Sequence, residues 1–403
     1  MAEVKKYSLV EKLREADKTL QGSPSLTGMT MLTYPNYINS MRSTMFVSHL
    51  KQFLNLLNPE VPYVFTNNER LVGKYSEGYR KTKNTLKVYR KIAKFDDIVD
   101  EPRVYKLFVF DEEAKTFDVI ERTVCENLTE NFGYDFINDV IDTFKEGDTI
   151  DPDTVMYRST SYDEDMNYGF GRNVTVAYTL DPYTSEDAAI VSESLAKQFT
   201  SIETETITIG LNSNDYFINL YGDKNHYKVL PSIGQKVSNK LAVIRRQFNN
   251  QLLFDFKDST LREILDGDSV YYVDSDVEIV DLTIYNNNEE RNDTPFYDEL
   301  NMYIDSQKRY YQDILDTCEE IINSGYEYSK DIDYLYKRSK DMVDVEKKWR
   351  DGDHSFNNME IEIQIRREAP LTKACKITGY NIWLVRIEIY VINCVNCWNI
   401  SVR

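Results

Sequence analysis

The sequence is poor in cysteine and histidine. Its 403 residues include five cysteines and three histidines. A sparse and odd set of cysteines argues against a disulfide framework and favours a reducing compartment. His49, His226 and His354 are too few and too scattered for a metal or acid–base site. The motifs G-x-S-x-G, the P-loop and G-x-G-x-x-G with a following acid are missing too. The sequence therefore carries no familiar signature of a stand-alone enzyme.

Long apolar runs and excess positive charge are also lacking. No run of about eighteen apolar residues occurs, so no transmembrane helix and no membrane partner are expected. The N-terminal M-A-E-V-K-K-Y lacks the apolar core of a signal peptide, which predicts a cytoplasmic protein. The formal net charge is -19, and this charge repels a naked phosphate backbone. Any nucleic-acid role must therefore be local, or shared with basic partners.

The rest of the composition is that of a folded protein. Hydrophobic residues make up 41% and aromatic residues 13% of a chain long enough for two or three domains. Helical spacing and strand-like alternation both occur, which predicts a mixed α+β fold. The predicted helices cover residues 1–20, 36–57, 128–145, 296–323 and 330–348. The predicted strands cover a hairpin at 105–110 and 116–123, most of 202–280, and 359–366.

One segment reverses the overall charge. Between Arg70 and Lys94 there are nine Lys or Arg residues and one acid, Glu77, with tyrosines interleaved. Basic residues with intervening aromatics suit a nucleic-acid backbone, but a solvated face or an acidic partner subunit explains them equally well. The candidate nucleic-acid-binding residues are Arg80, Lys81, Lys83, Lys87, Arg90 and Lys91, together with Arg42, which lies off the apolar stripe of predicted helix 36–57.

A strand, a turn and a helix are predicted between Gly169 and Lys197. Residues 174–180 are β-branched and aromatic, and Asp181-Pro182 ends the strand. Ser185 can then cap a helix that continues through Leu195, with Glu186 and Asp187 at its start. Two carboxylates at such a turn could hold a metal or a protonated ligand. The plainer explanation is the preference of acids for helix N-termini.

Other acidic and cysteine motifs are discounted as metal sites. Asp-Gly-Asp occurs at 266–268 and at 351–353, and acids alternate at Asp274, Asp276 and Glu278. These residues are common in turns and lack EF-hand spacing. The pair Cys394 and Cys397 has no second pair to complete four ligands. We therefore predict no metal ligands in this chain.

Several blocks, in order, resemble the second-largest (β) subunit of multisubunit DNA-dependent RNA polymerases. The most specific is E-D-A-x-I-x-S-E at 186–193, preceded by G-x-N-x-x-V-A. The other blocks are 39–45 with 61–69, the Gly-Asp turn at 145–155, I-G-Q-K-V at 233–237, and K-I-T-G at 376–379. Asn67 stands where the family has glycine. The sequence diverges strongly from the family and begins about where the middle of a full-length β subunit would lie. In both respects it resembles the split β subunits of jumbo bacteriophages.

The resemblance implies a fold and a chemistry. It implies part of a double-psi β-barrel, a flap-like β module and a helical insertion. It implies that Glu186 and Asp187 lie near the incoming nucleotide and that Lys376 faces the phosphates or the RNA 3′ end. Without the resemblance, the plain interpretation of Lys376 is an ordinary surface lysine. The catalytic Mg²⁺ would be held mainly by a β′-type partner. The implied partners are other β- and β′-type subunits, template DNA, nascent RNA and NTPs, in an infected bacterium's cytoplasm or packaged in a virion.

The resemblance implies five segments. These are a helical and basic segment (1–100), a β-rich segment with the first part of the barrel (101–210), a flap-like module with a helical arm (211–358), a return strand (359–379) and an atypical tail (380–403). The tail departs from the family, which expects Arg-x-Gly-x-Lys-Gly after Gly379 and a second active-site lysine. Two of the three tryptophans and two of the five cysteines lie in it. Read-through into an intron or inserted element, or a genuine C-terminal strand pair, would each explain this change.

Two further functions remain open on the residues alone. The polymerase-like blocks could be coincidental in a phage structural or DNA-packaging accessory protein without catalytic activity. Alternatively, Glu186 and Asp187 could serve a stand-alone carboxylate-metal phosphodiesterase.

Overall fold

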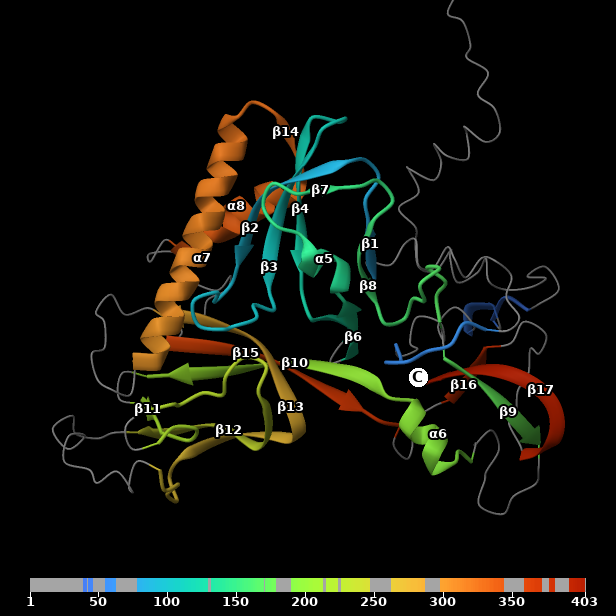
Figure 1. Ribbon diagram of the computed structural model, residues 1–403. Coiled ribbons are helices and arrows are strands. Elements are labelled where there is room, and N and C mark those ends of the chain that lie inside the picture. Colours follow the sequence, from blue (N-terminus) through green and yellow to red (C-terminus); the bar gives the residue numbers. More distant parts are fainter. Residues whose placement is uncertain are drawn as a thin grey trace, which may run out of the picture.

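The protein has an α+β fold of mostly antiparallel sheets with few helices (Figure 1). The computed structural model describes residues 39–41, 43–45, 55–62, 78–129, 132–169, 171–178, 190–212, 215–223, 226–246, 262–286, 298–343, 359–371, 377–380 and 391–402. Over these ranges the strands form three sheets, and none of the sheets closes into a barrel. No helix within them is long and apolar enough to cross a membrane.

The largest sheet has nine strands in the order β1-β8-β6-β10-β15-β13-β12-β11, with β5 paired to β6. Their bounds are β1 Tyr79–Lys81, β5 Cys125–Thr129, β6 Phe132–Ile137, β8 Val155–Ser159, β10 Ser201–Leu211, β11 Asp215–Phe217, β12 Lys236–Arg246, β13 Ser269–Asn286 and β15 Met359–Ala369. Isoleucines at alternate positions of β15 all face one side, as the strand period requires. Ile361 and Ile363 are fully buried there, opposite Ile209 and Ile207 of β10. The predicted strand at 359–366 is thus confirmed.

A five-stranded sheet, in the order β14-β4-β3-β2-β7, packs apolar side chains on both faces. Its strands are β2 Leu86–Ala93, β3 Tyr105–Asp111, β4 Thr116–Arg122, β7 Thr149–Ile150 and β14 Glu327–Tyr328. The predicted β3–β4 hairpin is confirmed. In β2, Val88 and Ile92 would share a face in a regular strand, yet they join different cores. A bulge between Val88 and Arg90 inserts an extra residue and reverses the faces.

Two helices join the sheets, α7 (Asp298–Asn323) and α8 (Lys330–Val343). The first half of α7 places Leu300 and Tyr303 in the main core, against side chains of the nine-stranded sheet. The second half places Ile314 and Cys318 against Phe108 of β3, beside α8. Each buried side chain of this size contributes about 1.5–3 kcal/mol. Both predicted helices are confirmed, and α7 packs against both sheets (Figure 1).

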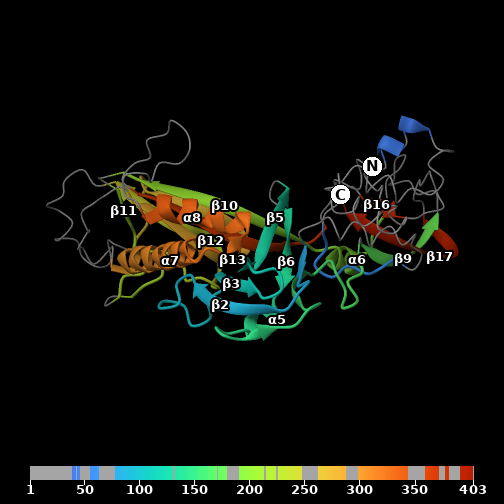
Figure 2. The same cartoon turned by 90° about the horizontal axis from the view of Figure 1, so that it is seen from above.

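A small third sheet lies at the opposite end of the molecule from β11 and β12 (Figure 2). It consists of β9 (Arg172–Tyr178), β16 (Ile377–Tyr380) and β17 (Val391–Val402), with β17 in the middle. The short helix α6 (Glu193–Gln198) lies near it (Figure 1). The tail of the chain thus contributes a strand paired with both neighbours.

Two helix predictions are wrong in part. Residues 128–145 form strands β5 and β6 and then only a short helix, α5 (Asp139–Thr143). The aromatic residues of β6 favour a strand, and its pairing with β5, β8 and β10 outweighs the helical spacing. The helix predicted for 36–57 is helical at 40–41 and 43–45, but Leu56 forms a β-bridge with Ser201. The helix predicted at 1–20 lies outside the described residues.

Candidate active centre and nucleic-acid interface

The candidate catalytic residues lie outside the described part of the chain, as does Arg42. Glu186 and Asp187 fall between β9 and α6, and Lys376 immediately precedes β16. The strands that border them meet in one sheet, because β9 and β16 both pair antiparallel with β17. Tyr178 of β9 pairs with Val391, whereas Ile377 of β16 pairs with Val402. The two strands therefore share a sheet, and these two residues lie at opposite ends of its middle strand.

The helix after the acid pair begins later than predicted. Residues 190–192 are not helical, and Ser192 is the N-cap of α6. Its hydroxyl accepts a hydrogen bond from the Leu195 N–H at 3.3 Å. The single helix predicted from Ser185 through Leu195 is therefore wrong at 190–192. Ser192, seven residues after Ser185, has the same side chain and can cap a helix in the same way, so the sequence offered two possible starting points.

Much of the basic segment contacts its own chain. Arg80 pairs with Asp118, and Lys81 Nζ lies 2.8 Å from an Asp153 carboxylate oxygen. Arg90 donates to the Thr317 hydroxyl of α7 at 2.8 Å and lies 3.5 Å from Glu320.

Lys91 is also held within the fold. Its ammonium donates to the Phe144 carbonyl at 3.1 Å and lies 4.2 Å from the centre of the Tyr105 ring. Burial lowers the pKa of Lys91, and Asp142 opposes that shift. These contacts attach β2 to its neighbours.

Two lysines of the segment keep their charge available. Lys83 and Lys87 are exposed and form no ion pair with any residue that the structure describes. They are the members of the predicted set whose charge the fold does not already use. That all six residues bind nucleic acid stays a prediction. The structure separates Lys83 and Lys87, which are exposed and form no ion pair with a described residue, from the other four, whose side chains contact the rest of the chain.

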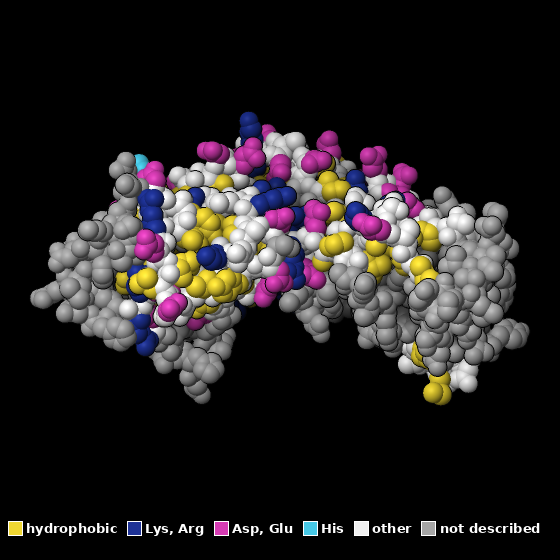
Figure 3. All heavy atoms as spheres, turned by 90° about the horizontal axis from the view of Figure 1, so that it is seen from below, with side chains coloured by type: hydrophobic (Ala, Val, Ile, Leu, Met, Phe, Trp, Pro, Cys, Tyr) yellow, Lys and Arg dark blue, Asp and Glu magenta, His cyan; other side chains and the backbone are white. Residues whose placement is uncertain are grey.

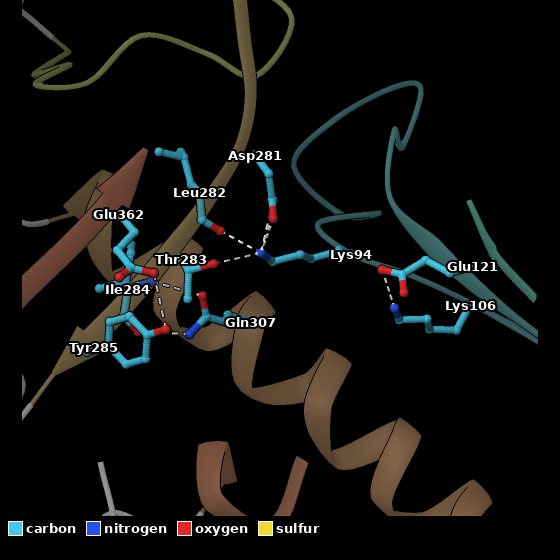
Figure 4. A network of polar contacts seen from close by, with 10 residues as sticks. All are labelled: Lys94, Lys106, Glu121, Asp281, Leu282, Thr283, Ile284, Tyr285, Gln307 and Glu362. Atoms are coloured by element: carbon cyan, nitrogen blue, oxygen red, sulfur yellow. Dashed lines mark hydrogen bonds and ion pairs between the residues drawn. The ribbon is translucent and has the colours of Figure 1, made fainter. Parts of the chain in front are cut away.

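Lys94, at the end of the same segment, is buried rather than solvated. Its ammonium contacts the Asp281 carboxylate, the Leu282 carbonyl and the Thr283 hydroxyl (Figure 4). Beside it, the Gln307 amide of α7 accepts from the Ile284 N–H and donates to its carbonyl. These side chains satisfy backbone groups of β13 beyond the point where its pairing with β12 ends.

The sequence did not predict a second charged cluster. Arg366 of β15 contacts Asp135 of β6 through two nitrogens, and Glu278 of β13 at 3.2 Å. Glu278 also pairs with Arg103. The hydrogen bonds to Asp135 raise the pKa of Arg366, so its charge is permanent. Arg366 also lies 3.9 Å from the exposed Glu368, so two arginines face three carboxylates, and each arginine is held by its partners within the fold. No local pattern joins residues so distant in sequence.

The discounted acids have structural partners. Asp268 receives two hydrogen bonds from Arg245, Asp274 pairs with Arg367, and Asp276 accepts from Ser238. Over the described ranges, no group of three His, Cys, Asp or Glu side chains could hold a metal.

The underside of the molecule shows hydrophobic side chains gathered on the side where β11 and β12 lie, with basic and acidic residues among them (Figure 3).

No protein-family model matches the sequence, and no curated protein matches it.

Proposed function

We propose that this chain is a β-type subunit fragment of a multisubunit DNA-dependent RNA polymerase, of the split jumbo-bacteriophage kind. It contributes active-centre residues for nucleotidyl transfer and is active only within a complex. In this proposal, the segments around β9 and β16 form part of a double-psi β-barrel, β12 and β13 belong to a flap-like module, and α7 and α8 are an insertion.

One observation supports the proposal most. The two most informative blocks lie beside strands that flank the same strand although they are far apart in sequence. These strands are β9, before E-D-A-x-I-x-S-E, and β16, which begins within K-I-T-G and ends at Tyr380. A shared active centre needs both blocks in one sheet, and it also needs residues 179–189 to reach from the Val391 end of β17 to the Val402 end, where Ile377 pairs.

The chemistry assigns a role to each candidate. Phosphoryl transfer needs metal ions at the attacking and leaving oxygens and cations for the developing charge. Lys376 would supply a point charge to phosphate, and Glu186 and Asp187 would tune the shell of a nucleotide-borne metal. The Mg²⁺ would be held mainly by a β′-type partner.

Co-purification from infected bacteria tests the proposal. A tagged chain is expected to recover other polymerase-like chains and to synthesise RNA in a template- and Mg²⁺-dependent manner. Recovery with capsids and no synthesis would replace the proposal with an accessory structural protein. Nuclease activity of the isolated chain would instead identify a phosphodiesterase.

A further inference from the structure

Three separate segments converge at one end of the five-stranded sheet. The Asn84 amide donates to the Asp111 carboxylate at 2.8 Å, which holds the β1–β2 loop against the β3–β4 turn. In the ladder between β2 and β3, Lys87 lies opposite Phe110. The α7–α8 connection reaches the same place, because β14 pairs with Phe117. All three segments lie at the upper end of the molecule in Figure 1.

Four aromatic rings meet at this convergence. Phe110 and Phe117 lie with ring centres 4.7 Å apart, and Tyr326 contacts Phe110 edge-on at 5.2 Å. Tyr89 contacts Phe117 edge-on at 5.4 Å. Tyr326 is 50% exposed and Tyr89 41% exposed, whereas Phe117 is buried beneath them. The cluster therefore fixes two tyrosines that present ring surface to solvent.

Three lysines lie on the segments that form this cluster. Lys83, Lys87 and Lys115 are all exposed, and none forms an ion pair within the described ranges. The Lys115 ammonium lies 5.7 Å from the centre of the Phe110 ring. Arg90, by contrast, is balanced by Glu320. We call Lys83, Lys87, Tyr89, Phe110, Lys115 and Tyr326 the aromatic–lysine surface.

We propose that the aromatic–lysine surface binds single-stranded nucleic acid. Exposed rings offer stacking faces to unpaired bases, and lysines at their edges neutralise the phosphates that flank each base. A duplex keeps its bases stacked internally and leaves the tyrosines without a partner. Glu112 and Glu113 lie in the same turn as Lys115, so binding is weak and sensitive to salt. The inference rests on the proposed function, which brings a separated strand to this chain.

Fluorescence anisotropy of the full chain with labelled 20-nucleotide dT and U strands tests the proposal. Lys83→Gln/Lys87→Gln/Lys115→Gln is expected to weaken binding and to lower the salt slope of log K by about 2, since each single-strand phosphate contact contributes roughly 0.7. Tyr326→Ala is expected to weaken binding roughly tenfold through lost stacking. Glu112→Gln/Glu113→Gln is expected to strengthen it.

A matched control removes the same charge elsewhere. Lys236, Lys308 and Lys337 are exposed on β12, α7 and α8, and their triple glutamine variant is expected to bind as the wild type does. Equal weakening by both triple variants would overturn the proposal, as would preference for a duplex or for polyglutamate. RNA synthesis by the co-purified complex is measured separately. Synthesis without strand binding overturns this inference alone, whereas strand binding without synthesis overturns the proposed function alone.

Discussion

Lys94 and Asp281 join the five-stranded sheet to the nine-stranded sheet through a buried ion pair. The ammonium nitrogen lies 2.9 and 2.7 Å from the two carboxylate oxygens, and 2.6 Å from the Leu282 carbonyl oxygen. The side chain of Lys94 is only 4% exposed and that of Asp281 19% exposed. Lys94 directly follows β2, and Asp281 follows a bulge in β13. The contact therefore fixes how the two sheets are held together.

Replacing Lys94 by methionine is expected to destabilise the protein by about 3 kcal/mol, because Asp281 is left as an uncompensated and largely buried charge. Urea unfolding measures the change. Lys94→Met/Asp281→Leu is expected to recover part of the loss, and Lys337→Met, at an exposed site, to change stability by less than about 0.5 kcal/mol. A single variant as stable as the wild type would show that the pair does not hold the sheets together.

Asp268 gives a pH-dependent prediction. Burial alone would raise its pKa, but hydrogen bonds from Arg245 and from the Leu265 N–H, with the Arg245 charge, hold the pKa below the usual value. A carboxyl with a lowered folded-state pKa stabilises the protein above its unfolded pKa of about 3.9, and this contribution disappears as the pH falls through the folded pKa. Asp268→Asn is therefore expected to cost about 2 kcal/mol near neutral pH and progressively less in acid.

Urea unfolding of the wild type and of Asp268→Asn at several pH values between about 7 and 2 measures how their difference in stability shrinks as the pH falls. Asp266→Asn removes an exposed carboxylate from the same turn and serves as the control. A difference between wild type and Asp268→Asn that stays constant with pH would contradict the assigned role of the Arg245 contact.

The proposed active centre predicts a kinetic effect without a structural one. Asp187→Ala is expected to slow nucleotide addition by about 10- to 100-fold while leaving subunit assembly intact, as expected for a group that tunes a metal shell. Glu205→Ala is the control, because this exposed carboxylate lies on β10, outside the polymerase-like blocks. Single-turnover extension by the purified complex measures both, and an unchanged rate for Asp187→Ala would refute its role.

The tail carries a prediction of its own. β17 pairs with β9 and β16, so deleting residues 381–403 is expected to leave two sheet edges unpaired and to promote aggregation, measured by light scattering. A truncated chain that stays monomeric would contradict a structural role for β17. Sequencing transcripts across codon 379 tests the alternative, since continuous message into codon 380 in every transcript removes the intron hypothesis.

The local sequence pattern predicted correctly those elements whose apolar residues recur at the spacing of one type of secondary structure. Helices α7 and α8 carry apolar residues at helical spacing, and β15 alternates isoleucine with polar residues, so each was predicted close to its observed bounds. The α+β class follows from these elements. In residues 128–145, by contrast, aromatic residues at helical spacing form a strand because pairing with three other strands outweighs the local pattern.

By itself the sequence determined the class of fold, the excess of acid, the basic segment and the polymerase-like blocks. Only the tertiary structure decided which lysines of that segment keep a free charge, that Lys94 is buried against Asp281, and that Tyr326 lies beside Phe110. The reason is physical: a side chain's charge and exposure depend on partners contributed by distant segments, and no local pattern specifies which segments pack together.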